Sequence, residues 1–175
     1  MTARVYLRHP APEDRDEFLE RVRASRGLHR PWTYPPATDE AFALFVERSR
    51  SPNDTSLVRR REDHAIVGVM SISNIVYGPF RSAALGYHAF EPFAGEGYMS
   101  EGLSLVLGRA FGELRLHRLE ANIQPGNERS IALASRAGFR YEGYSPRFLK
   151  IGGRWRDHER WAILAEDHRG RRHRS

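Results

Sequence analysis

Cysteine is absent from this sequence of 175 residues. A chain without cysteine can hold no disulfide and no thiolate zinc site, and it cannot pass an acyl group through a cysteinyl intermediate. Long apolar runs are absent too. No segment approaches the roughly 20 apolar residues that cross a bilayer, and the opening MTARVYLRHP lacks the apolar stretch of a signal peptide. With 40% hydrophobic residues, the composition suits one globular domain, which we expect to be cytoplasmic.

The common motifs for nucleotides and metals are also missing. No GxxxxGK[ST] of a P-loop is present, and the pair Gly95 and Gly97 lacks the third glycine of a dinucleotide fingerprint, because Ser100 stands there. The interval from Gly97 to Ser100 is one residue too long for the GxSxG nucleophile elbow. None of the eight histidines forms an HExxH pair. These absences disfavour a P-loop enzyme, a dinucleotide enzyme, a serine hydrolase and a zinc hydrolase, and we expect no metal.

Negative charge is in short supply, since 28 Lys and Arg against 22 Asp and Glu leave a formal net charge of +6. Much of the excess lies in the C-terminal DHRGRRHRS. Because such a polar run cannot bury itself, we expect a folded domain over residues 1–165 and a basic, flexible tail over 166–175. The tail is either solvated or in contact with RNA or the ribosome. The sequence contains neither an aromatic RNP strand nor a GXXG loop, the motifs that would indicate an RNA-binding domain.

The apolar pattern alternates strands and helices without a repeat, which favours one α/β domain. It predicts strands at 4–9, 55–61, 65–76 and 82–90 and helices at 11–25 and 39–50. Between the helices, three prolines in RPWTYPP should break any helix over 27–36. Apolar residues three or four apart predict a long amphipathic helix from Met99 to Leu114.

The stretch EPFAGEGYMSEG places Gly95 and Gly97 directly before this helix. The first turn of a helix has N–H groups without intrahelical acceptors and carries the positive end of the helix dipole. Such an end can bind an anion, and glycines let a phosphate approach the amides without meeting a Cβ. The alternative is that the glycines only tighten the turn.

The segment that follows carries a family resemblance. A glycine loop before a helix, then a strand, then N-x-x-S-x-x-L ending in AGF and EG is similar to the acetyl-CoA-binding half of the GNAT superfamily of N-acetyltransferases. RPW, SNIVYG, LGYH and KIGGRWRDHERW resemble the RimJ/RimL-like branch, the ribosomal-protein-alanine N-acetyltransferases. The resemblance runs from YLR to WAIL. It implies a single-domain α/β fold of the α+β type, with a mixed, mostly antiparallel sheet of about seven strands, splayed between strands 4 and 5 and flanked by about four helices.

The resemblance also implies acetyl-CoA as co-substrate, with its pantetheine arm between the strands LGYHAFE and RLEANIQ. Asn127 would contact the arm, although asparagine is equally favoured as a helix N-cap. Glu96 replaces the basic residue usual between the two glycines, so Arg129 or Arg136 would supply the compensating charge. The residues implied to bind CoA are Phe90, Ala94, Gly95, Glu96, Gly97, Tyr98, Asn127 and Ser130.

In the implied reaction a primary amine attacks a thioester, an oxyanion develops and a thiolate leaves. The tyrosine that protonates the thiolate in many family members would align with Ala134, and the resemblance moves this role to Ser130, which is otherwise an exposed helix serine. A strand bulge near 88–90 would aim an amide at the thioester oxygen. His88 is the candidate base, with a structural strand histidine as the alternative. Other candidate bases, acting directly or through water, are Glu101, Glu120 and Asp157.

For the acceptor, we predict contacts with Asn74, Trp32 and Tyr87. Asn74 either faces the acceptor cleft or lies at a strand edge near a turn. Trp32 either forms part of an aromatic wall of that cleft or packs in the core. Gly152 and Gly153 predict a tight hairpin, which in this family borders the acceptor groove.

The sequence thus predicts an acetyl-CoA-dependent N-acetyltransferase that acts on a protein N-terminus, such as that of a ribosomal protein, by direct attack in a ternary complex. The alternatives are a GNAT enzyme for a small amine (an antibiotic, polyamine or amino acid) and a non-catalytic acyl-CoA-binding protein. Ribosome association and a monomeric or homodimeric state are further expectations, and no membrane partner is expected.

Overall fold

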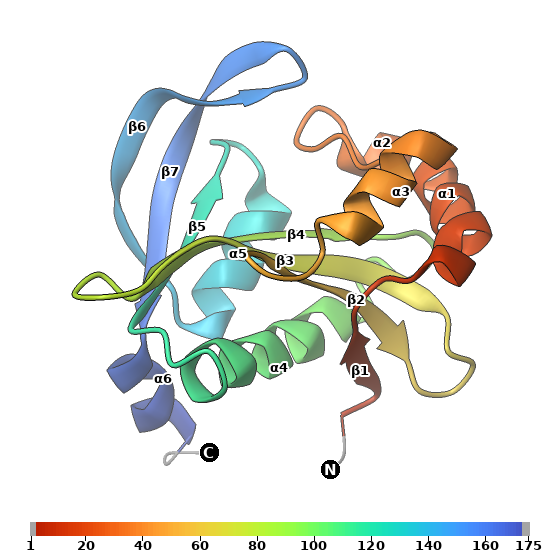
Figure 1. Ribbon diagram of the computed structural model, residues 1–175. Coiled ribbons are helices and arrows are strands. Elements are labelled where there is room, and N and C mark those ends of the chain that lie inside the picture. Colours follow the sequence, from red (N-terminus) through yellow and green to blue (C-terminus); the bar gives the residue numbers. More distant parts are fainter. Residues whose placement is uncertain (1–2, 173–175) are drawn as a thin grey trace.

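The computed structural model describes residues 3–172, which form one seven-stranded sheet with helices on both faces (Figure 1). The strands are β1 (Val5–Arg8), β2 (Asp54–Arg60), β3 (Ile66–Val76), β4 (Ser82–Ala89), β5 (Arg118–Ile123), β6 (Arg140–Ile151) and β7 (Arg154–Leu164). The helices are α1 (Arg15–Ala24), α2 (Arg26–His29), α3 (Asp39–Glu47), α4 (Tyr98–Gly112), α5 (Glu128–Ala137) and α6 (Ala165–Arg172), preceded by the 3-10 helix η1 (Pro12–Asp14).

The sheet order is β1-β2-β3-β4-β5-β7-β6, and only the central pair β4–β5 is parallel. That pair is short. It begins at Ser82 opposite Arg118 and ends at Leu85 opposite Ala121, whereas β4 continues to pair with β3 up to Ala89. Beyond Leu85 the two central strands therefore part, and the polar backbone groups of β4 that point toward β5 lose their sheet partner. The predicted mixed sheet that splays between strands 4 and 5 is confirmed.

Alternation along β3 divides the core into two layers. Val69 belongs to a cluster with Phe18, Val22 and Phe42 of α1 and α3, whereas Met70 faces the cluster built on α4. The apolar stripe of α4 is fully buried, as its spacing predicted, through Leu103, Val106, Leu107, Ala110 and Phe111. Burying one such side chain contributes about 1.5–3 kcal/mol, so α4 is held firmly against the sheet.

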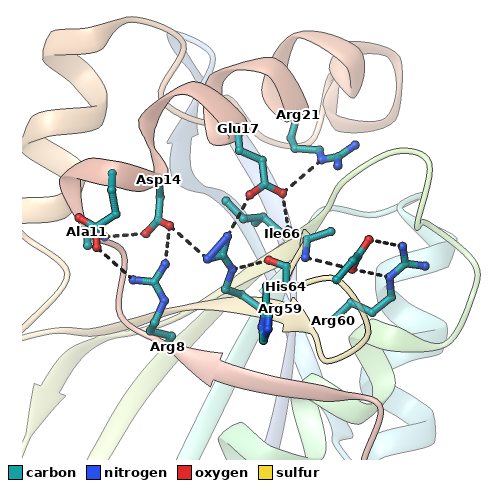
Figure 2. Close-up of polar contacts among 12 residues, drawn as sticks. Arg8, Ala11, Asp14, Glu17, Arg21, Arg59, Arg60, His64 and Ile66 are labelled. Atoms are coloured by element: carbon teal, nitrogen blue, oxygen red, sulfur yellow. Dashed lines mark hydrogen bonds and ion pairs between the residues drawn. The ribbon is translucent and has the colours of Figure 1, made fainter.

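An ionic network fixes α1 on the opposite face (Figure 2). Asp14 is 3% exposed and accepts hydrogen bonds from Arg8, from the backbone N–H of Ala11 at 2.8 Å and from Arg59 at 3.3 Å. Glu17, one turn later, accepts from Arg59 at 2.9 Å and from the Ile66 N–H at 2.6 Å. The two carboxylates thus connect the start of α1 to β2 and β3.

Several details differ from the sequence prediction. The described residues contain six α-helices rather than about four. Helix α2 lies within the segment expected to break any helix, because the first proline, Pro31, follows its end at His29. The prediction of a bulge near residues 88–90 is wrong, because the pairing of β4 with β3 is regular from Ala84 to Ala89. The register shift between these strands lies between Ser73 and Val76 of β3 instead.

The C-terminal helix α6 crosses the predicted boundary between the domain and the tail. The division into residues 1–165 and 166–175 stays a prediction, and residues 173–175 lie outside the described part of the chain. Within residues 3–172, none of the helices is long and apolar enough to cross a membrane.

Candidate active site

A cleft of about 1410 Å³ opens where β4 and β5 part. Its walls come from β4, the end of β5, part of β3, the N-termini of α4 and α5, helix α2 with the segment after it, and the β6 and β7 strands. Elements distant in sequence meet here because the splayed sheet leaves a gap at its centre. The first turns of two helices line this cleft, α4 through Met99 and Ser100 and α5 through Glu128, Arg129 and Ser130.

The glycine loop forms one end of this cleft. Gly97 is the N-cap of α4 with φ 86°, and Gly95 has φ 89°. A Cβ at Gly95 would meet nothing within 4 Å, which leaves the backbone open to a ligand. The Ser100 and Glu101 amides return to the Gly97 carbonyl at 3.1 and 3.2 Å, while the preceding first-turn N–H groups have no intrahelical acceptor. This is the geometry expected of an anion site.

Arg4 stabilises this loop, although nothing in the sequence indicated a role for it. Its guanidinium donates to the Glu96 carbonyl at 2.9 Å and to the Glu101 carboxylate at 2.6 Å, and it lies 4.5 Å from the centre of the Tyr98 ring. Glu96 and Tyr98 themselves are not among the described residues that line the cleft, whereas Ala94, Gly95 and Gly97 are. The side chain of Glu96 is exposed, so the acid between the glycines is turned to solvent.

At the start of α5, Asn127 caps the helix, since its Oδ1 accepts from the Ser130 N–H at 3.4 Å. Asn127 is therefore the N-cap of α5, one of the two roles predicted for it. Asn127 also lines the cleft, and a CoA contact would use its amide NH₂ group. Arg129 and Arg136 line the cleft from the same helix, where they can offset the charge of a diphosphate.

Ser130 is joined to Tyr87 across the cleft. The Ser130 Oγ donates to the Tyr87 hydroxyl at 3.0 Å, and that hydroxyl donates to the Ser130 carbonyl at 3.1 Å. Burial raises the pKa of Tyr87 to about 12, although its hydrogen bond with Ser130 opposes the change. Tyr87 was predicted to contact the acceptor; the structure places it beside the residue predicted to protonate the thiolate.

Phe90 does not reach the cleft as predicted. Its side chain is 0% exposed and packs with Phe18 and Val69 in the α1–α3 cluster, and its N–H donates to the Val67 carbonyl. Phe90 follows the last residue of β4, and its ring is enclosed by the aromatic rings of the α1–α3 cluster and by His29 and His88. A CoA contact by its ring is therefore excluded.

His88 lies in the cleft wall with its Nε2 buried. Burial, together with repulsion from His29, lowers the pKa of His88 to about 3. An α-ammonium has a pKa of about 7.7–8.0, so His88 would accept its proton only against about 5 pH units. The imidazole is thus neutral but is a poor general base.

The other candidate bases are engaged elsewhere. Glu101 binds Arg4, and Asp157 accepts from the Tyr144 hydroxyl and the Arg147 N–H, outside the cleft lining. Glu120 lines the cleft. Burial raises the pKa of Glu120, but its ion pairs with Arg118 and Arg160 outweigh burial and leave the pKa below its usual value. Direct base action by these carboxylates is thus disfavoured.

The other two predicted acceptor residues, Asn74 and Trp32, also line the cleft. Asn74 is exposed at the β3 bulge with φ 52°. Trp32 is half-buried, and its carbonyl accepts from the Gln124 side chain at 2.9 Å, which ties the segment after α2 to the end of β5. The following Tyr34 packs on Gly152 of the predicted β6–β7 hairpin, where a Cβ would lie 2.6 Å from its ring. The hairpin is confirmed.

Comparison with known proteins agrees with this geometry. Residues 4–140 match the acetyltransferase (GNAT) domain family. The chain is 39% identical over 173 residues to the probable N-acetyltransferase YjcK of Bacillus subtilis, covering 93% of this chain and 95% of that protein. It is 38% identical over 106 residues to the [ribosomal protein uS5]-alanine N-acetyltransferase of Escherichia coli, covering 61% of this chain and 55% of that protein.

Among solved structures, Mycobacterium smegmatis RimJ in complex with CoA-disulfide superposes with a TM-score of 0.85 at 28% identity, covering 93% of this chain and 82% of that one. A spermidine N-acetyltransferase from Vibrio cholerae in complex with CoA and spermine superposes with a TM-score of 0.79 at 19% identity, covering 94% of this chain and 98% of that one. The second likeness shows a shared fold alone.

The splayed sheet, the glycine-capped helix and these matches place the chain in the GNAT family of acetyltransferases, on the RimJ/RimL-like branch. It is an N-acetyltransferase with acetyl-CoA as its co-substrate. Within residues 3–172, no group of three or more His, Asp or Glu could hold a metal ion.

Proposed function

We propose that this enzyme transfers acetyl from acetyl-CoA to the N-terminal α-amino group of a protein, such as a ribosomal protein, by direct attack in a ternary complex. The main observation behind this proposal is that one cleft extends from the glycine loop before α4 to a region lined by exposed apolar residues, where we place the acceptor. Phe80 and Leu149 line this cleft and are 60% and 39% exposed. Exposed apolar surface around a groove is typical of a binding site, and here it offers contacts to an acceptor larger than its amine.

On the donor side, the diphosphate of CoA would rest on the amides of residues 94–98, with Asn127 against the pantetheine arm. The thioester would then lie between β4 and β5, where the unpaired β4 amides can donate to the developing oxyanion. Ser130 would pass its hydroxyl proton to the departing thiolate and be reprotonated through water by the proton that the attacking amine loses, so that the step is balanced. Holding both reactants in this gap supplies most of the acceleration that such a reaction needs.

The protonation state of the acceptor supports an α-amine. An α-amino group of pKa about 7.7–8.0 is roughly a quarter neutral near pH 7.4, whereas a lysine amine of pKa about 10.4 is neutral about one time in a thousand. Glu120 in the cleft is already in two ion pairs, and the pKa of His88 is about 3. Burial also lowers the pKa of the other two cleft histidines, His29 and His158, so the cleft offers little help with deprotonation. An amine that is partly neutral suits such a site.

The charge of the cleft argues against a polyamine acceptor. Three carboxylates, Glu91, Glu120 and Glu128, line the cleft among the described residues, and Arg118 and Arg160 already bind Glu120 at 2.8 Å. Arg129 and Arg136 line the same cleft, so a polycation would meet positive as well as negative charge there. A peptide backbone would instead meet hydrogen-bonding groups such as the Asn74 amide and apolar surface.

The test is acetyl transfer to a peptide library varied at its first residues, beside a panel of small amines, with released thiol as the measurement. Preferred turnover of peptides supports the proposal, and preferred turnover of a small amine contradicts the acceptor class. CoA binding without thiol release from any acceptor would identify a non-catalytic binding protein. Acetylation of ribosomal proteins in the cytoplasm, and association with the ribosome, would be tested by mass spectrometry of N-termini in cells with and without the enzyme.

A further inference from the structure

A smaller pocket of about 290 Å³ lies beside the cleft, between α3 and the sheet. Leu44 and Phe45 of α3 form its apolar wall, and Thr55 of β2 and Ser71 of β3 lie on the strands below them. Leu44 is 40% exposed, so apolar surface is open to solvent here. Ligand pockets usually measure about 300–1,000 Å³, so this pocket has room for one side chain rather than for a whole ligand.

The pocket adjoins the cleft. Ser73 of β3 lines both of them, and the segment after α2 borders both, through Thr33 in the cleft and Pro36 in the pocket. Gly86 of β4, which pairs with Ser71, also lines the cleft. Gly86 is exposed although β4 lies in the middle of the sheet, and a Cβ there would meet nothing within 4 Å. The surface that leads from the cleft to the pocket is therefore open at this point.

The register of the strands gives the distance from the gap to the pocket. The pairing of β4 with β5 ends at Leu85, so Gly86 is the first residue of β4 at the gap. Gly86, Ser71 and Thr55 lie opposite one another on three neighbouring strands. Because neighbouring strands are about 4.8 Å apart, Thr55 lies about 10 Å from Gly86. An extended peptide advances about 3.3 Å per residue, so an acceptor amine at the gap places the third residue of its chain at the pocket.

The lining of the pocket suits an aliphatic side chain. The hydroxyls of Thr55 and Ser71 are hydrogen-bonded to each other at 2.6 Å, which reduces the cost of covering them with an apolar group. Among the described residues that line the pocket there is no carboxylate, and the one charged residue is Arg48. A lysine of the acceptor would therefore meet a like charge. A glutamate would gain only an exposed ion pair with Arg48, which contributes little, whereas an aliphatic side chain would be buried against Leu44 and Phe45.

We propose that this pocket binds the side chain of the third residue of the acceptor peptide and selects an aliphatic residue there. The proposal rests on the function proposed above and deepens it, because it adds a determinant of which N-termini the enzyme acetylates. The acceptor is then held at two points, its amine in the gap between β4 and β5 and its third side chain under α3. Attachment at two points fixes the direction in which the amine approaches the thioester.

Peptides that differ at a single residue test the subsite. They share an alanine-rich sequence with a free α-amino group and carry leucine, lysine or glutamate at position two, three or four. With thiol release as the measurement, kcat/KM should be about tenfold higher for leucine than for alanine at position three, and no higher for lysine than for alanine. An effect of leucine at position two or four as large as that at position three would overturn the subsite, as would a preference for glutamate at position three.

Substitutions on α3 test whether the pocket causes the preference. Ala41 lines the pocket and is half-buried, so Ala41→Leu should fill the pocket and abolish the preference for leucine over alanine at position three. Leu44→Ala removes part of the apolar wall and should reduce the preference. The matched control is Ala43→Leu, the same change at an exposed position of the same helix outside the pocket lining, which should keep the preference of the wild type. The ratio of kcat/KM between two peptides does not depend on the fraction of folded enzyme, so a loss of stability cannot imitate the effect.

The outcomes separate the subsite from the acceptor class. If a small amine is acetylated and no peptide is, the proposed function fails and the peptide subsite fails with it. If peptides are acetylated equally well whatever their third residue, the subsite alone fails. A leucine preference that persists in both Ala41→Leu and Leu44→Ala would assign the preference to another part of the cleft and overturn the subsite.

Discussion

Tyr87 and Ser130 form a reciprocal hydrogen-bonded pair that bridges β4 and α5. The Ser130 hydroxyl donates to the Tyr87 oxygen at 3.0 Å, and the tyrosine proton is directed to the Ser130 carbonyl at 3.1 Å. With a pKa of about 12, Tyr87 stays protonated in the neutral pH range. It holds the serine side chain in one orientation, beside the gap where the thiolate would form.

Substitution of Ser130 tests its assignment as the proton donor. Ser130→Ala should lower kcat by about 10²–10⁴-fold, the usual contribution of a general acid, with little change in the Kd for acetyl-CoA. Tyr87→Phe, which removes only the partner that orients the serine, should give a smaller loss. Steady-state kinetics measure both, and an unchanged kcat in Ser130→Ala would show that another group protonates the thiolate.

The glycine loop should be intolerant of side chains. Gly97 has φ 86°, and a Cβ there would lie 3.2 Å from the Arg4 guanidinium. Gly97→Val should therefore strain the loop and weaken acetyl-CoA binding at least tenfold, as calorimetry would report. The control is Gly108→Ala in the same helix, where a Cβ meets nothing within 4 Å. It should raise the Tm slightly and leave the Kd unchanged.

Stability should depend on pH through His88. The pKa of His88 is about 3 in the folded protein against an ordinary value of 6.5. Because the unfolded chain takes up the proton first, this contribution is complete above about pH 6.5 and is lost as the pH falls toward 3. The loss is at most about 5 kcal/mol at 1.36 kcal/mol per unit.

His88→Leu removes that titration. The free energy of unfolding of the variant, measured by urea denaturation at several pH values, should fall less between pH 6.5 and 4 than that of the wild type. Parallel curves for the two proteins would show that His88 is not the group responsible.

The buried carboxylate of Asp14 should contribute strongly to stability. Asp14→Asn leaves Arg8 and Arg59 without their shared anion, and breaking a buried pair costs about 3–5 kcal/mol. For a protein of this size the Tm should fall by about 10 °C. The control is Asp16→Asn, because the Asp16 side chain on α1 is 85% exposed. This substitution should change the Tm little. Similar Tm values for the two variants would contradict the role of the network.

Much of the fold was predictable because its signals are local. The apolar spacing of α4 depends on residues three or four positions apart. The glycines before α4 likewise adopt the positive φ that only glycine takes up readily. The short helix α2 was missed because the prolines that follow it dominate the pattern, although a proline after a helix does not prevent the helix itself.

The side-chain partnerships of the site were less accessible. Arg4 and Glu101 lie 97 positions apart and meet only when β1 joins the sheet beside α4. His29 and His88 come together only when α2 packs against β4. Nothing in the sequence near His88 indicated a partner, and its free-peptide pKa suggested a base.

The amino-acid sequence by itself determined most of the elements, the family and the glycine-capped helix, because backbone preferences and hydrophobic periodicity act between close neighbours. Only the tertiary structure decided which side of β4 each residue serves, that Phe90 belongs to the core, and that His88 is too weakly basic to take a proton. Burial and the approach of distant groups set those properties, and both arise only when the chain has folded.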